Sequence, residues 1–219
     1  MYKACVFDMD GTILNTLNSI AHFGNEALKK YGFQAIEAEK YKQMVGNGVD
    51  ILLQRMLKEA NVSDPEKMVK DIRMEYDRLY EANPIYLVEP YEGIKEMLAE
   101  LKEKGIRLAV LSNKPDNMTK YLADAFFPNI FDAVYGQRID VPKKPNPTAL
   151  NGIRNEFVAD KGELFYCGDS GVDMQTGKNG RAFTVGVSWG FRSKKELREC
   201  GADKIVDTAS ELLELILGC

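Results

Sequence analysis

Short apolar runs alternate with longer amphipathic stretches over most of the chain. We predict strands in the apolar runs, at Lys3–Phe7, Arg107–Leu111, Ala133–Tyr135, Leu164–Cys167, Ala182–Val187 and Lys204–Val206. From residue 91 onward a helical stretch separates most successive strands; the first, Tyr91–Lys104, stops at Gly105, a residue type that suits a helix end. Strands that alternate with helices predict an α/β fold, in which a parallel sheet is covered by helices on both faces.

This alternation is interrupted after the first strand, because residues 15–83 contain no convincing strand. A helical stripe of apolar residues begins at Leu17 and ends at Gly32, and further helices are expected at Glu37–Met44 and Val49–Ala60. A fourth helix should follow Asp64, since an N-cap acceptor stands there before Pro65. We therefore predict an all-helical domain over residues 15–84, inserted into an α/β core domain formed by residues 1–14 and 85–219.

Composition narrows the possible classes of protein. The 219 residues are 45% hydrophobic and 28% charged, an ordinary balance for a globular protein, and the net charge is only -4. This weak charge gives no indication of a nucleic-acid or membrane partner. The four cysteines have no CxxC spacing, which argues against zinc. The first residues lack signal-peptide architecture, so we expect a cytoplasmic protein with reduced thiols.

Four segments at or after predicted strands carry unusual polar residues. They read Asp8-Met9-Asp10-Gly11-Thr12, Ser112-Asn113-Lys114, Lys143-Lys144-Pro145-Asn146-Pro147 and Gly168-Asp169-Ser170-Gly171-Val172-Asp173. A parallel sheet gathers the carboxyl ends of its strands at one edge, where ligands bind. Each segment alone is weak evidence, since such residues are common in turns and helix caps. Their joint occurrence predicts a site with four carboxylates, a hydroxyl and a lysine.

These residue types suit metal-assisted phosphoryl transfer. Close carboxylates raise one another's pKa unless a cation is present, and hard oxygen ligands without His or Cys favour magnesium. One carboxylate could attack phosphorus, and a second one two residues away could protonate the leaving oxygen and then deprotonate water. A hydroxyl and a lysine would hold the phosphate oxygens.

The same segments carry a resemblance to a known family. DMDGTILNT, LAVLSNK, KKPNP and GDSGVDMQTGKNG resemble, in this order, the four motifs of the haloacid dehalogenase (HAD) superfamily of phosphohydrolases. VEPYEGIKEML and VGVSWGFRSKKEL resemble segments of its phosphoglycolate phosphatase-like group, and the helical insertion stands where that group has its cap domain. The resemblance implies a HAD-like fold: a Rossmann-like parallel sheet core with a helical cap.

The resemblance also implies roles for individual residues. Asp8 would be the nucleophile that forms an aspartyl-phosphate, and Asp10 the general acid and base. Ser112, Asn113 and Lys144 would bind the phosphoryl group. Magnesium would be held by Asp8, by the backbone carbonyl of Asp10, and by Asp169, with Asp173 as a ligand or as a partner of the ligands. An acid at position 10 favours phosphate over halide chemistry, because a halide leaves without protonation.

A glycine-rich turn in the helical insertion is our candidate for substrate selection. Gly46, Asn47 and Gly48 lie between two predicted helices, and free backbone N–H groups at a helix start attract anions. We expect this turn to contact the far end of the substrate, which in phosphoglycolate is a carboxylate. A tight turn between helices with no ligand role is the equal alternative.

Together these observations predict a magnesium-dependent phosphomonoesterase, a monomer or homodimer, that acts on a small phosphorylated metabolite, with 2-phosphoglycolate favoured. An inorganic pyrophosphatase, or a sugar-phosphate or nucleotide phosphatase, is the alternative on the same site. A phosphomutase or a non-catalytic binding protein ranks below these. The cap is expected to move about hinges at Ile13–Asn18 and Asn83–Pro90.

Overall fold

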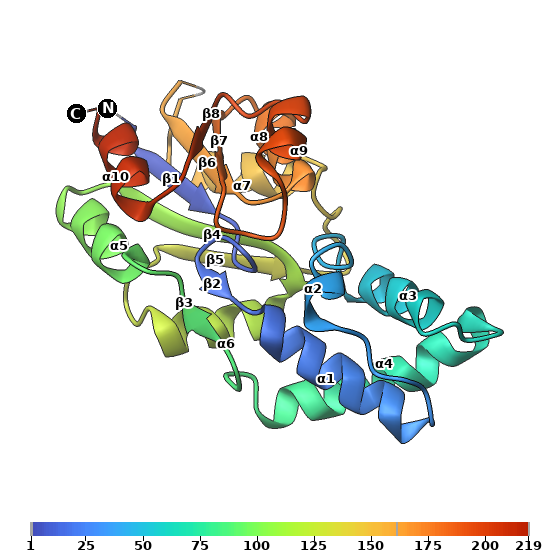
Figure 1. The fold of residues 1–219 in the computed structure, drawn as a ribbon. Coiled ribbons are helices and arrows are strands. Elements are labelled where there is room, and N and C mark those ends of the chain that lie inside the picture. The colour runs from blue at the N-terminus through green and yellow to red at the C-terminus, as the bar shows by residue number, and fades with distance from the viewer. Residues whose placement is uncertain (1, 161, 219) are drawn as a thin grey trace.

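A six-stranded parallel sheet forms the centre of the molecule (Figure 1). The computed structural model describes residues 2–160 and 162–218. In the sheet order β5-β4-β1-β6-β7-β8, every neighbouring pair is parallel. The strands are β5 (Ala133–Gln137), β4 (Arg107–Pro115), β1 (Ala4–Phe7), β6 (Leu164–Gly168), β7 (Phe183–Val187) and β8 (Lys204–Val206). The predicted α/β fold is therefore confirmed, since each expected strand is present.

Helices cover both faces of this sheet because alternate strand residues point in opposite directions. One face packs Phe7 and Val110 against α5 (Ile94–Glu103), α6 (Asp116–Phe126) and α10 (Ala209–Leu217). The other face packs Val6 and Ala109 against α7 (Thr148–Glu156), and carries α8 (Gly171–Asn179) and α9 (Lys194–Glu199) farther along. All four residues of β1 are buried, as expected for a strand at the centre of a covered parallel sheet.

The second strand of the core is longer than expected. We predicted it at Arg107–Leu111 with its polar residues following the strand, but β4 continues to Pro115. Its pairing with β5 shifts register between Leu111 and Pro115, where Pro115 comes opposite Gln137. Ser112, Asn113 and Lys114 therefore lie within the irregular end of a strand.

The helical insertion follows β1 and lies beside one end of the sheet (Figure 1). It contains α1 (Leu17–Lys30), α2 (Ala38–Tyr41), α3 (Val49–Glu59) and α4 (Pro65–Ala82), which share an apolar core of their own. The expectation of a helix at Glu37–Met44 was wrong in length, since only four residues are helical. The Asp64 carboxylate does not cap α4, because it pairs with Lys67 Nζ at 2.5 Å.

Two short strands join the insertion to the sheet. β2 (Leu14–Asn15) enters it, β3 (Glu89–Pro90) leaves it, and they pair antiparallel with Leu14 opposite Pro90. The two crossing segments therefore run side by side. We propose the division into a core of residues 1–14 and 85–219 and a cap of residues 15–84 on this basis. Every helix along the described part of the chain is too short or too polar to cross a membrane.

Candidate active site

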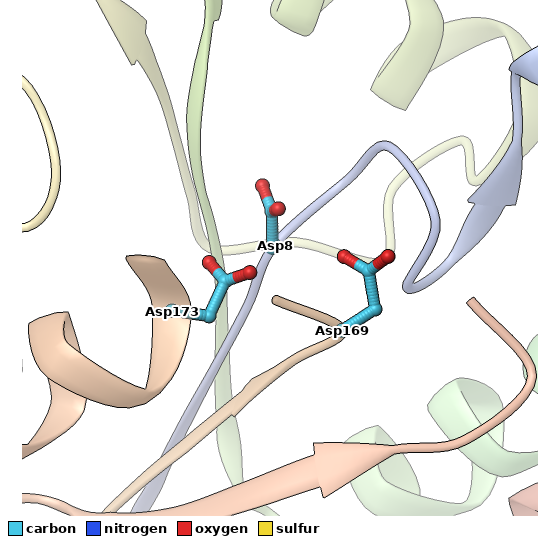
Figure 2. A group of neighbouring side chains, drawn as sticks. All are labelled: Asp8, Asp169 and Asp173. Carbon is cyan, nitrogen blue, oxygen red and sulfur yellow. The ribbon is translucent and has the colours of Figure 1, made fainter. Parts of the chain in front are cut away.

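The two central strands and the helix after β6 bring three carboxylates together. Asp8 follows β1, Asp169 follows the neighbouring β6, and Asp173 lies in the first turn of α8. One carboxylate oxygen from each lies within 4.8 Å of the others, and all three residues are buried. Figure 2 shows the three side chains clustered at this edge of the sheet. The convergence expected from parallel strand ends is present for these acids.

Lys144 supplies the positive charge of this cluster. Its Nζ lies 2.8 Å from Asp8 Oδ1 and 2.8 Å from Asp173 Oδ1, and its side chain is only 3% exposed. Burial opposes the charged form, but Asp173 and Asp8 outweigh it and hold the pKa of Lys144 well above its usual range. The lysine is therefore a fixed cation between two acids.

The oxygens of Asp173 are already satisfied by protein donors. Oδ1 accepts hydrogen bonds from Lys144 Nζ at 2.8 Å and from the Tyr166 hydroxyl at 3.1 Å. Oδ2 accepts from the Ser170 N–H at 3.1 Å and the Ser170 hydroxyl at 2.5 Å, in a capping box at the start of α8. This arrangement turns Asp173 back toward the strand end and suits it to orient Lys144 more than to bind an ion.

The pKa values of the Asp8 and Asp169 carboxyl groups are both raised in the folded protein. Burial, followed by the charge of Asp173, raises the pKa of Asp8 to about 7, although Lys144 opposes the shift. Burial and the charges of Asp173 and Asp8 likewise raise the pKa of Asp169 well above its usual range, while a hydrogen bond from the Phe191 N–H opposes this. Both carboxylates would therefore be stabilised in their ionised form by an additional cation.

The donor set fits a hard divalent ion. Among the described residues, Asp8 Oδ1 is a buried oxygen without a hydrogen bond, because Lys144 Nζ lies near it in ion-pair geometry only. A carboxylate oxygen has two lone pairs, so this one can still accept a further ligand besides its ion pair with Lys144. Asp8 and Asp169 offer carboxylate oxygens, the ligand type that magnesium prefers.

Asp10 lies apart from the three-acid cluster and has a different partner. Lys114 Nζ lies 3.2 Å from each of its carboxylate oxygens, and both side chains are nearly buried. The same ammonium stands 4.8 Å from the centre of the Tyr80 ring, on the insertion. Two acids that are two positions apart in the sequence are thus kept in separate environments. Our sequence reasoning gave Lys114 no role, and its position directly after Ser112 and Asn113 was the available signal.

Asn113 links the core motifs to the insertion. Its side-chain amide donates to the carbonyl oxygens of Gly46 at 2.9 Å and Lys144 at 3.2 Å, and its Oδ1 accepts from the Lys144 N–H at 2.9 Å. Ser112 is buried beside it, and its hydroxyl accepts from the Lys114 N–H at 3.3 Å. The family resemblance implied a phosphate contact for Asn113, but not this contact across the two parts of the molecule.

A cavity of about 190 Å³ lies between these residues and the helical insertion. From the core it is lined by the chemically relevant side chains Asp8, Asp10, Ser112, Asn113, Lys114 and Asp169. Gly46 and Gly48 line it from the insertion, whereas Asn47 is not part of the described lining. Lys144 and Asp173 also lie outside this lining, buried beside Asp8.

The backbone of the glycine turn requires residues without a side chain. Gly46 has φ +112° and Gly48 has φ +88°, values that residues with a Cβ rarely adopt. Gly48 immediately precedes α3, and a Cβ there would come within 3.0 Å of Lys143 Nζ. The turn therefore brings the start of α3 close to the core and to the cavity.

Comparisons with known proteins agree with this architecture. Residues 5–187 match the model of a family described as haloacid dehalogenase-like hydrolase. The chain is 29% identical to a phosphoglycolate phosphatase of Vibrio parahaemolyticus over 219 residues, which cover 98% of this chain and 96% of that protein. Two crystal structures of proteins predicted to be phosphoglycolate phosphatases are also similar. One, from Lactobacillus delbrueckii subsp. bulgaricus, has a TM-score of 0.94, 31% identity and coverage of 100% and 99% of the two chains. The other, from Haemophilus somnus, has a TM-score of 0.91, 26% identity and coverage of 98% and 97%.

Proposed function

The chain belongs to the haloacid dehalogenase-like hydrolase family and is a phosphatase, and from this premise we propose a specific reaction. The enzyme hydrolyses a small phosphorylated metabolite through an aspartyl-phosphate on Asp8, with magnesium as the cofactor. The favoured substrate is 2-phosphoglycolate, the compound for which the similar curated proteins are named.

The observation that carries this proposal is the separation of Asp8 from Asp10. Asp8 lies among buried carboxylates next to Lys144, while Asp10 faces the same cavity from a pair with Lys114. Two acids with equal surroundings would compete for one role, but these two can act at different ends of the breaking bond. An acid at position 10 is needed when an alkoxide leaves, which favours phosphate esters over halides.

Chemistry at the cavity then follows from these positions. Asp8 attacks phosphorus, the bond from phosphorus to the ester oxygen breaks, and Asp10 gives a proton to the departing oxygen. Asp10 next takes a proton from water, which attacks the phosphorus of the aspartyl-phosphate and releases inorganic phosphate and free Asp8. Ser112, the backbone N–H groups near Met9 and Asn113, and Lys144 hold the phosphoryl oxygens during both steps.

Asp8 and Asp169 would hold magnesium through their carboxylate oxygens, and the family resemblance adds the backbone carbonyl of Asp10. When bound, it supplies positive charge that offsets the charge of these acids and of the phosphoryl group. Asp173 keeps Lys144 in place, since its own oxygens are engaged by protein donors.

The glycine turn supports the choice of an anionic substrate. Gly48 and Val49 line the cavity at the start of α3, and an eleven-residue helix has a positive N-terminal end. We propose that this end faces the carboxylate of phosphoglycolate while the phosphoryl group meets Asp8.

A substrate panel tests the function. The purified protein with magnesium should release phosphate from phosphoglycolate with a higher kcat/KM than from pyrophosphate, sugar phosphates or nucleotides. A chelator should stop release. A preference for another member of the panel would overturn the substrate, and release that survives the chelator would overturn the cofactor.

A further inference from the structure

The segment that follows β7 contacts both the acid cluster and the helical insertion. The Phe191 N–H donates to Asp169 Oδ2 at 2.7 Å, and the Phe191 side chain is buried in the apolar core of the insertion. Among the described residues, it is the one buried member of that core from outside the insertion itself. One residue thus holds a carboxylate of the site with its backbone and the insertion with its ring.

Asp169 is enclosed so tightly that this contact fixes its position. A Cβ on Gly190 would come 2.3 Å from the Asp169 Cβ, and a Cβ on Gly11 would come 2.3 Å from Asp169 Oδ2 and 3.0 Å from the Phe191 ring. The backbone on both sides of the carboxylate therefore approaches it as closely as glycine permits. A shift of residues 190–191 would displace Asp169 directly.

Arg192 joins this segment to the turn that leads into the cavity. Its guanidinium donates to the carbonyl oxygens of Lys42 and Val45, the latter at 2.8 Å, and its side chain is only 9% exposed. The Arg192 Nε also lies 3.5 Å from Glu196 Oε1, which accepts from the Gly171 N–H at 3.0 Å. Arg192 is therefore also connected to the region of Asp169 through Glu196 and Gly171, the first residue of α8.

Five consecutive carbonyl groups of the insertion, from residue 42 to residue 46, are held by side chains. From the core, Arg192 donates to the carbonyl groups of residues 42 and 45, and Asn113 donates to that of residue 46. Arg55, which belongs to the insertion, donates to the carbonyl groups of residues 43 and 44, at 3.3 and 3.0 Å. Two arginines thus form hydrogen bonds with the same turn, Arg192 from the core and Arg55 from the insertion.

From these contacts we propose that Arg192 is a positioning residue that couples docking of the insertion to the orientation of Asp169. When the turn at residues 42–46 is docked on the core, Arg192 and Phe191 keep Asp169 in the position from which it binds the cation. When the turn moves away from the core, Asp169 is no longer fixed in that position. Coupling of this kind is reciprocal, so cation binding must favour docking by the same factor. The inference rests on the proposed function, because it assigns Asp169 to a magnesium ion.

The test compares Arg192→Ala with Arg55→Ala, since both remove a guanidinium from the same turn but only the first crosses the boundary. Magnesium affinity is measured by calorimetry without substrate, and amide hydrogen exchange of residues 42–48 is followed with and without magnesium. We expect Arg192→Ala to bind magnesium about tenfold more weakly and to lose the protection that magnesium gives this turn. Arg55→Ala should keep both properties close to those of the unmodified protein.

Turnover of p-nitrophenyl phosphate separates this inference from the function itself. Arg192→Ala should lower kcat at a fixed subsaturating magnesium concentration and recover as magnesium is raised, which a general loss of folding would not do. Arg192→Lys, which keeps the charge but cannot bridge two carbonyls, should give a smaller effect in the same direction. Unchanged magnesium affinity in Arg192→Ala, or equal losses in both alanine variants, would overturn the coupling. Absence of magnesium-dependent turnover in the unmodified protein would instead overturn the proposed function.

Discussion

Without a divalent cation, the protein should lose stability as the pH rises from 5 to 7, and Asp8 should be a main cause. The pKa of Asp8 is raised from 3.8 to about 7 in the folded state, chiefly by burial and then by Asp173. Between these two values the folded form keeps a proton that the unfolded form has lost. The resulting stability is fully present below pH 3.8 and is lost as the pH rises through about 7.

The magnitude follows from the size of the shift. One pKa unit corresponds to about 1.4 kcal/mol, so the change in pH from 5 to 7 should lower the free energy of unfolding by about 2 kcal/mol. For a chain of this length, that loss corresponds to a fall in Tm of about 4 to 8 °C. Glu75 does not interfere, because its ion pairs with Arg78 and Lys30 lower its pKa to about 2, well below this range.

Urea unfolding at several pH values, in chelator and in saturating magnesium, measures this effect. Asp8→Asn removes the titrating carboxylate and should show a shallower loss, although Asp169 still contributes to the slope. Magnesium favours the ionised carboxylates, so it should stabilise the unmodified protein more at pH 7 than at pH 5. Equal slopes for the unmodified protein and Asp8→Asn in chelator, or equal stabilisation by magnesium at both pH values, would refute the reasoning.

Three further outcomes follow from the site. Lys144→Ala leaves Asp8 beside buried like charges, so it should lower the free energy of unfolding by about 3 to 5 kcal/mol and abolish phosphate release. The control Lys143→Ala removes a side chain that is 39% exposed and should change neither property greatly. Similar urea midpoints for the two variants would count against this. Gly48→Ala places a side chain at φ +88°, a backbone conformation that favours glycine. It should raise KM for phosphoglycolate while turnover of p-nitrophenyl phosphate continues. An equal loss of activity on both substrates would indicate misfolding. Calcium in place of magnesium should stop phosphate release, because it takes more oxygen ligands and can engage both oxygens of the nucleophile; full turnover with calcium alone would contradict the geometry.

Local sequence signals were sufficient for the core and for most of its acids. The buried run of β1 ends at Asp8 as its pattern predicts, and the pair Ser170 and Asp173 has the three-residue spacing of a capping box, which turns Asp173 back toward the sheet. These features depend on neighbours in the chain or on the general rule that parallel strands end at one edge. They could therefore be read from residue types and spacing.

Contacts between distant segments could not be predicted in this way. The helix expected at Glu37–Met44 ends at Tyr41, and the carbonyl groups that follow bond to Arg192 and Arg55. One of these partners lies 150 residues away, so no local pattern records it. The pairing of Lys114 with Asp10 is hidden for the same reason, since 104 positions separate the two residues. The contacts that sequence reasoning missed join segments far apart in the chain, either across the boundary with the insertion, as for Arg192, or within the core, as for Lys114.

The aspartyl-phosphate on Asp8 is the central claim, and Asp10→Asn provides the most direct test of it. p-Nitrophenolate leaves without protonation, so this variant should form the intermediate but activate water poorly. After mixing with p-nitrophenyl phosphate and magnesium, we predict a burst of nitrophenolate equal to the protein concentration. Acid quenching and peptide mass analysis should then find one phosphoryl group on Asp8. A phosphoryl group on any other residue, or a burst without a phosphorylated peptide, would contradict the account.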